Sequence, residues 1–274
     1  MIDYYSYEKM NTHMYAIRSM SQEIMYLIEG SDKAILIDTC VGVGDLKGVV
    51  ESLTDKPLTV LLTHGHIDHA LGAPCFDEVY MNLADIDIYK GMRDIEGRIG
   101  YIQTTLGDKA PALEESDFVP VADVDFKDLQ DGMIFDLGGI HVEVYALAGH
   151  TPGSMMMLVP EERLLITGDA CNTFTFLFDD NTKPVDEYKE NCIRVKKLLE
   201  GRYDRVCLSH RQIYATKNIL EEVIEVCDDI LNGNTDDIPF EFMGKKTYIA
   251  KAMNEKFERV DGKQGNIVYS KKRA

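Results

Sequence analysis

Four side chains of types that commonly bind metal ions lie within six consecutive residues of this chain. They are His64, His66, Asp68 and His69, and they directly follow the apolar run 58–62. On extended backbone, residues two apart point to the same side, so the first two can bind one cation, and the last two, where the chain turns, can face a second. Imidazole and carboxylate ligands without thiolate favour zinc, with manganese or iron as alternatives.

Three further candidate ligands follow apolar runs later in the chain. They are His150, after the run 142–147, Asp169, at the end of 164–169, and His210, at the end of 205–210. Each lies at the carboxyl end of an expected strand, where α/β proteins usually place their sites. Taken singly, each has an ordinary explanation as a loop histidine or a capping aspartate. Together they form a strand-end pattern of five histidines and two aspartates, which chance rarely assembles.

Apolar patterning predicts the elements that position these side chains. Runs typical of strands occur at about 24–29, 33–38, 58–63, 78–82, 133–137, 140–147, 154–159, 163–168, 205–209 and 265–269. Apolar stripes with helical spacing occur at 46–53, 89–106, 184–201 and 219–231. This order of elements indicates an α/β or α+β protein without linkers, low-complexity segments or a clear repeat.

The HxHxDH pattern of residues 64–69 and the three later ligands resemble the metallo-β-lactamase-fold hydrolase superfamily over roughly residues 20–215. The stretch 149–154 is similar to that of glyoxalase II and its relatives. The resemblance implies a four-layer αββα sandwich over residues 1–212. Residues 213–274 are then a C-terminal helix and strand extension packed on the same domain, and 84–119 is an insertion at a position where related enzymes often carry a lid.

The same resemblance implies how the ligands divide between two metal ions. The first metal takes His64, His66 and His150, the second takes Asp68, His69 and His210, and Asp169 bridges the two. No member of the set is missing, which argues against an inactive or single-metal relative. The expected cofactors are therefore two Zn²⁺ ions, with Mn²⁺ or Fe as alternatives.

A dinuclear hydrolase is the function that this resemblance implies. A hydroxide held between two metals attacks an electrophilic carbonyl or phosphorus, and Asp68 is the expected catalytic side chain, which orients the hydroxide and carries a proton to the leaving group. The expected substrate is a small thioester, ester or lactone. Two alternatives stay open: a phosphodiesterase of the same fold acting on a nucleotide or phospholipid head group, and a metal-binding scaffold without turnover.

Composition restricts the partners and the compartment. The chain has 274 residues and a net charge of −18, which disfavours a nucleic acid as partner. Its N-terminus lacks the pattern of a signal peptide and no run is long enough to span a bilayer, so we expect a cytoplasmic protein that binds a small molecule and no membrane. Six cysteines without CxxC spacing fit a reducing compartment. The sequence makes no prediction of oligomeric state.

Several residues near the ligands have two interpretations. Asp38, at the end of an expected strand, could accept a hydrogen bond from a ligand imidazole or could be a structural cap. Arg211 could hold a substrate carboxylate or form a surface salt bridge. Alternating phenylalanines could line an apolar pocket or form a buried strand edge; they are Phe174, Phe176 and Phe178. Hydroxyl side chains beside the ligands are expected in turns and caps; they are Thr63, Thr151 and Ser154.

Overall fold

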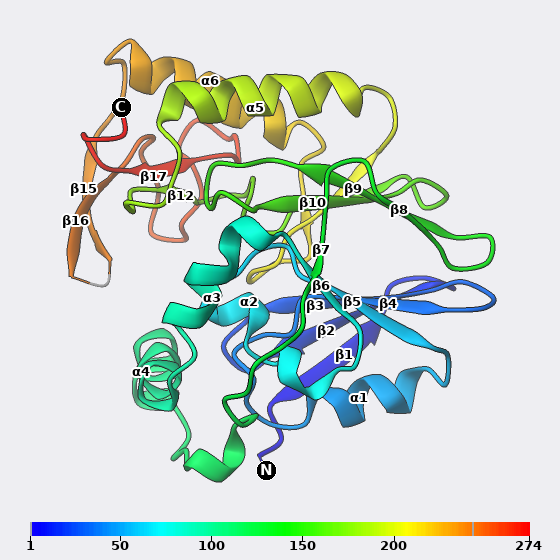
Figure 1. The fold of residues 1–274 in the computed structure, drawn as a ribbon. Helices are drawn as coiled ribbons and strands as arrows, with labels where there is room; N and C mark the ends of the chain where they lie inside the picture. The colour runs from blue at the N-terminus through cyan, green and yellow to red at the C-terminus, as the bar shows by residue number, and fades with distance from the viewer. Residues whose placement is uncertain (1, 243) are drawn as a thin grey trace.

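Two sheets pack face to face in the computed structural model, which describes residues 2–242 and 244–274 (Figure 1). The first sheet has the order β1 (Tyr5–Lys9), β2 (Met14–Ser19), β3 (Ile24–Glu29), β4 (Ala34–Ile37), β5 (Leu58–Leu61), β6 (Val79–Met81) and β7 (Lys127–Asp128). The second has the order β14 (Tyr214–Ala215), β13 (Arg205–Cys207), β11 (Leu164–Ile166), β10 (Met155–Val159), β9 (His141–Ala146) and β8 (Ile134–Asp136).

Helices cover the outer face of each sheet (Figure 1). The first sheet is covered by α1 (Leu46–Leu53), α3 (Ile86–Gly91) and α4 (Ile95–Leu106), and the second by α5 (Val185–Leu198) and α6 (Ile219–Leu231). One short helix, α2 (Ile67–Ala70), follows β5 after a five-residue loop. Two sheets with helices on both outer faces form the predicted four-layer αββα sandwich, and that prediction is confirmed.

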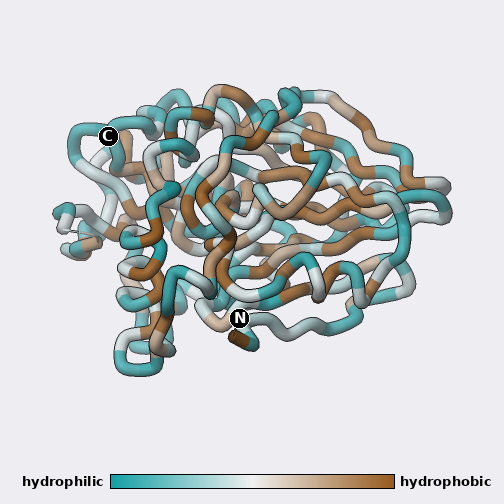
Figure 2. The backbone as a smooth tube through the Cα atoms, turned by 60° about the horizontal axis from the view of Figure 1, so that its bottom comes forward, coloured by the Kyte–Doolittle hydropathy of each residue, from teal (hydrophilic) through white to brown (hydrophobic). Residues whose placement is uncertain are grey.

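The alternation of side chains along the central strands explains why the sandwich has three apolar layers. In β3, Ile24, Tyr26 and Ile28 enter the core between the sheets, whereas Met25 and Leu27 face the helices on the outer side. Both faces of such a strand are buried, so its sequence is apolar throughout. Figure 2 shows these apolar segments running through the interior of the molecule.

Most predicted elements are present, with three differences. The stripe 89–106 is divided between α3 and α4, because Asp94 caps a new helix by accepting a hydrogen bond from the amide of Gly97 (2.6 Å). The strands β1, β2 and β7 were not predicted; β1 is an edge strand with mostly exposed side chains and therefore no apolar run, and β7, at the other edge, has only two residues. The C-terminal extension contains β14 and a hairpin as well as the expected helix and strand.

A third, smaller sheet joins the C-terminal extension to the rest of the molecule. Its order is β12 (Thr175–Leu177), β17 (Ile267–Tyr269), β16 (Lys245–Ile249) and β15 (Ile238–Phe242). β12 belongs to the segment after Asp169, and it pairs in parallel with β17 near the C-terminus. α6 shares its apolar core with α5. The division of the chain at residue 212 stays a prediction. Among the described residues, no helix has the length and apolar character needed to cross a bilayer.

Candidate metal centre

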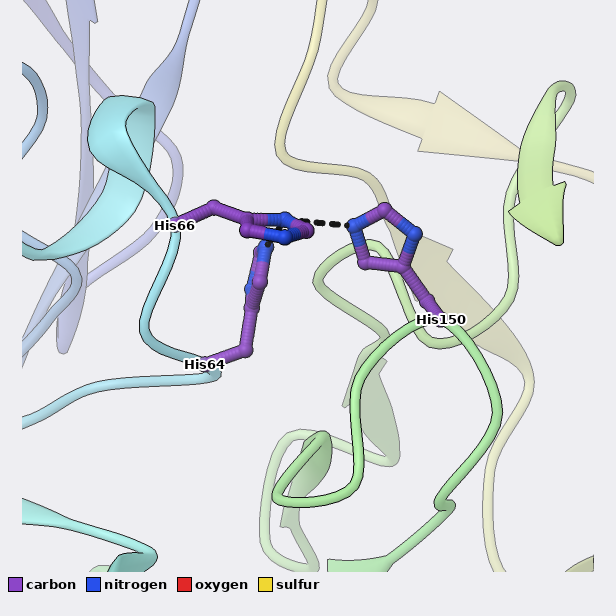
Figure 3. A group of neighbouring side chains, drawn as sticks. All are labelled: His64, His66 and His150. Carbon is purple, nitrogen blue, oxygen red and sulfur yellow. Dashed lines mark hydrogen bonds between the residues drawn. The ribbon is translucent and has the colours of Figure 1, made fainter. Parts of the chain in front are cut away.

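Three histidines converge on one point between the ends of two sheets. The facing nitrogens of His64, His66 and His150 all lie within 4.8 Å of one another. The Nδ1 atom of His66 is 3.1 Å from Nε2 of His64 and 2.9 Å from Nε2 of His150 (Figure 3). The structure thus brings together the three residues that the sequence assigned to the first metal.

A second group adjoins the first and has two carboxylates. Its members are Asp68, His69, Asp169 and His210, whose ligand atoms also lie within 4.8 Å of one another. The Nε2 atoms of His69 and His210 are 3.1 Å apart. The carboxylate of Asp169 faces both groups: its Oδ2 is 3.7 Å from Nε2 of His69 and 3.8 Å from Nε2 of His150. All seven predicted ligands are therefore in these two groups; that they bind metal stays a prediction.

The ends of four strands position these side chains. β5 ends two residues before Thr63 and three before His64, and α2 then turns the chain so that Asp68 and His69 belong to the second group, with the ring of His69 4.1 Å from that of His64. His150 lies in the loop from β9 to β10, and the other two ligands follow β11 and β13. These strands end at the same edge of the sandwich, as the sequence pattern predicted.

Asp38 fixes the orientation of two of the imidazoles. Its Oδ2 is 2.8 Å from Nδ1 of His69, and its Oδ1 accepts the backbone N–H of Thr63 (2.7 Å). The hydroxyl of Thr63 donates to the same carboxylate and lies 3.0 Å from Nδ1 of His64. Asp38 is thus the partner of the imidazole of His69, a candidate ligand, and Thr63, expected to be a turn residue, connects it to the imidazole of His64.

The third imidazole is oriented by the backbone. Nδ1 of His150 lies 3.0 Å from the carbonyl oxygen of Phe176, which can only accept a hydrogen bond. The Nδ1 atom therefore carries the proton, and Nε2 presents a lone pair to the first group. A ligand imidazole whose rear nitrogen donates to a carbonyl or carboxylate is the usual arrangement at protein metal sites.

Burial and neighbouring charges shift histidine pKa values in opposite directions in the two groups. Burial, reinforced by nearby imidazoles, lowers the pKa of His66 to about 3 and that of His64 well below its usual range. In the second group, burial opposes the charged form of His210, but Asp169 and Asp68 outweigh it and raise its pKa to about 9. His64 and His66 are therefore neutral, and the second group pairs its imidazoles with carboxylates.

Asp85, which the sequence analysis missed, connects the two loops of the first group. Its buried carboxylate accepts hydrogen bonds from the amides of Gly65 (3.0 Å) and Gly153 (2.7 Å) and from the hydroxyl of Thr151 (2.6 Å). A Cβ atom on either glycine would come within 3.0 Å of Asp85. Its position three residues after the predicted strand 78–82 was a signal, because the seven candidate ligands also follow strands.

We expect Asp85→Asn to lower the free energy of unfolding by about 1–3 kcal/mol, because an amide nitrogen in place of one oxygen leaves a buried donor without an acceptor. The melting temperature should fall by roughly 2–10 °C. The matched control is Asp87→Asn on the exposed face of α3, which should change stability by less than about 0.5 kcal/mol. Equal melting temperatures for the two variants in calorimetry would contradict this role.

The insertion 84–119 also reaches the second group. The hydroxyl of Tyr101, on α4, lies 3.0 Å from Oδ2 of Asp68 and 2.8 Å from Oε1 of Glu23. Glu23 is buried and also accepts a hydrogen bond from Ser21 (2.5 Å). No sequence signal pointed to these residues, because their contacts depend on how the insertion folds back over the site.

The other candidates also have defined partners. Thr151 and Ser154 form a hydrogen-bonded turn, in which the amide of Thr151 donates to the hydroxyl of Ser154 (3.0 Å), as expected. Arg211 forms no ion pair with any described residue; its guanidinium instead lies over the ring of Phe257, 5.4 Å from the centroid. Of the alternating phenylalanines, Phe176 lies in β12 and the other two flank it; all three are half-buried, so they are not a fully buried strand edge.

Residues 22–210 match the sequence model of the metallo-β-lactamase superfamily. Human acyl-coenzyme A thioesterase MBLAC2 is 23% identical over 214 residues, which cover 71% of this chain and 75% of that protein. The atrochrysone carboxyl ACP thioesterase of Claviceps purpurea is 27% identical over 148 residues, which cover 53% of this chain and 38% of that protein. The superfamily match includes all seven candidate ligands.

Solved structures share the fold. The metallo-β-lactamase from Pontibacter korlensis superposes with a TM-score of 0.57 at 15% identity, over 82% of this chain and 99% of that one. The sec-alkylsulfatase Pisa1 from Pseudomonas sp. gives a TM-score of 0.65 at 15% identity, over 84% of this chain and 42% of that one. At such identities the likeness concerns the sandwich architecture.

Proposed function

This chain belongs to the metallo-β-lactamase superfamily and is a hydrolase, and we propose that it is a dinuclear metal-dependent enzyme that cleaves a small thioester, ester or lactone. The observation that carries the proposal is the pair of adjoining ligand groups with the Asp169 carboxylate between them. Two relatives are named as thioesterases, which favours a thioester among the three substrate classes. The net charge of −18 disfavours a nucleic-acid substrate.

The hydrogen bonds of the first group support a bound cation. The rear nitrogens of His64 and His150 face an oxygen on Thr63 and on Phe176, so both histidines turn an unprotonated Nε2 toward His66. A proton on Nδ1 of His66 could satisfy only one of these two lone pairs. A cation at this point would accept a lone pair from each of the three nitrogens, as zinc does at a three-histidine site.

The second group supports a second cation for a different reason. Two carboxylates and two imidazoles meet there, and Oδ1 of Asp169 lies 3.3 Å from Nε2 of His210. A divalent cation would replace the protons that hold these groups together in the metal-free protein. We assign His64, His66 and His150 to the first metal, Asp68, His69 and His210 to the second, and Asp169 to both. Zinc suits this mixture of imidazole and carboxylate ligands, and manganese or iron are the alternatives.

The residues around the two groups have separate tasks in the proposed reaction. Two divalent cations, when bound, lower the pKa of a water molecule and polarise the substrate carbonyl. Asp68 would orient the attacking oxygen and carry its proton to the leaving group. The hydroxyl of Tyr101, 3.0 Å from Oδ2 of Asp68, would hold that carboxylate in place. Asp38 would keep the Nδ1 proton on His69, so that Nε2 stays available.

We expect protein purified without chelators to contain two metal ions per chain, predominantly zinc. Elemental analysis measures this number, and the same preparation is then assayed on a panel of thioester, lactone and bis-phosphodiester substrates. Chelation should abolish hydrolysis, and zinc should restore it. One metal or none would contradict the dinuclear assignment. Hydrolysis of the phosphodiester alone would contradict the proposed substrate class.

A further inference from the structure

Six of the ten phenylalanines gather on the small third sheet and the loop beside it. We call them the phenylalanine surface: Phe174, Phe176, Phe178, Phe240, Phe242 and Phe257. Each is half-buried or exposed, and within the described residues none belongs to or packs against an apolar core cluster. The four remaining phenylalanines all do; they are Phe76, Phe118, Phe126 and Phe135. Packing of the apolar core therefore does not explain why phenylalanine occupies these six positions.

Two segments far apart in sequence build this surface. In β12, Thr175 and Leu177 are buried, so Phe176 points to the opposite, outer face of the sheet. Its ring lies 4.9 Å from that of Phe242 on β15, centroid to centroid, and 5.2 Å from that of Phe178. Together with Phe240, whose ring lies 6.2 Å from that of Phe242, these rings form one apolar cluster. Phe174, two residues before Phe176, forms a second pair with Phe257, with centroids 6.3 Å apart.

The phenylalanine surface borders the candidate metal centre at the first group and at the bridging aspartate. The carbonyl of Phe176 holds Nδ1 of His150 at 3.0 Å. The backbone amide of Phe174 donates to Asn172 (2.6 Å), whose side-chain amide in turn donates to Asp169 (3.2 Å).

A third connection runs through the residue after His210. The guanidinium of Arg211 lies over the ring of Phe257, which is 56% exposed. Both partners have left-handed backbone, with φ of 61° each, a conformation that non-glycine residues adopt rarely. Phe257 is thus connected, through Arg211, to the segment that carries His210 of the second group.

We propose that the phenylalanine surface binds the hydrocarbon of the substrate's acyl group, so that the enzyme prefers medium-chain or aromatic acyl groups over acetyl. This inference rests on the proposed thioester, ester or lactone hydrolysis. An acyl chain whose carbonyl lies at the metal centre would extend over the adjoining rings and remove them from water. Phe240, Phe242 and Phe257 lie outside the superfamily match at residues 22–210, so they would give this chain a specificity of its own.

The first test is a series of N-acetylcysteamine thioesters from acetyl to decanoyl. For the wild-type protein, kcat/KM should rise by roughly two- to fourfold per added methylene until the surface is covered, because each buried methylene contributes about that factor to binding. A flat series with measurable hydrolysis of every member would overturn the inference and leave the proposed function standing.

The second test is the double variant Phe242→Ala/Phe257→Ala. Its kcat/KM for the octanoyl thioester should fall by about 10- to 100-fold, mainly through KM, as expected when binding is lost equally from the ground and transition states. Its activity on the acetyl thioester should change by less than about twofold. The matched control is Ile134→Ala, since Ile134 is 62% exposed on β8 and lies outside the phenylalanine surface. In this variant, kcat/KM should depend on acyl-chain length as it does in the wild type.

Direct binding separates failure of the inference from failure of the proposed function. Calorimetry of octanoate and acetate with the metal-loaded protein needs no turnover. If no thioester, ester or lactone is cleaved, the proposed function fails. The wild-type protein should still bind octanoate more tightly than acetate, and the double variant should bind both with similar affinity. An equal loss for acetyl and octanoyl substrates, or an effect confined to self-association in sedimentation, would overturn the inference.

Discussion

His64→Ala and His150→Ala are each expected to reduce the metal content from two ions per chain to about one and to abolish measurable hydrolysis. Each imidazole supplies one of the three nitrogens that converge in the first group. Loss of a residue that only supports a ligand typically costs about 10–100-fold in metal affinity or activity, so loss of a ligand should exceed that range. Elemental analysis and assays on the same preparation measure both effects.

His141→Ala is the matched control for these two variants. His141 lies on β9 and hydrogen-bonds Glu161 at 2.7 Å, at the surface and away from both ligand groups. Its loss should leave the metal content at two and the activity within about twofold of wild type, because surface substitutions away from special features have small effects. If His141 proved as critical as His150, the assignment of the first metal would be wrong.

The sandwich was predictable where strands are buried on both faces. The apolar runs that became β3, β4, β5, β10 and β11 lie between two layers, and burial on both sides leaves a continuous apolar sequence. β1 has no such run, since it lies at the edge of its sheet with one neighbour. β15 combines exposed residues with Pro239, so its pairing with β16 follows from the hairpin rather than from a local pattern.

The convergence of the seven candidate ligands was predictable because each follows a strand, and the residues that contact them were predictable only in part. Asp38 follows β4 and was a candidate for that reason. Tyr101 and Glu23 belong to a helix and a strand start that meet only when the insertion folds over the site, so no spacing in the sequence connects them. Asp85 lies between these cases: its strand-end position was visible, but its three donors come from loops 20 and 66–68 residues away.

Asp169→Asn is expected to cause the second-largest loss, because it keeps the shape of the side chain and removes its charge. The carboxylate faces His69 and His210 in one group and His150 in the other. Between two cations that repel each other, one negative charge at about 4 Å contributes roughly 4 kcal/mol at an effective dielectric constant of 20, or about a thousandfold in affinity. The variant should therefore still bind one metal, through the three histidines of the first group, and bind the second about a thousandfold more weakly than the wild type does.

The alternative explanation of Asp169 is that it only caps the turn after β11, a task that asparagine performs about as well. Asp45→Asn provides the reference for that case, since Asp45 caps α1 by accepting from the amide of Gly48 at 2.9 Å. It should lose neither metal nor activity. Titration of both variants with zinc against a competing chelator, followed by hydrolysis at each occupancy, separates the two explanations. If Asp169→Asn behaved like Asp45→Asn, the carboxylate would be a cap and a shared site between the two groups would be excluded.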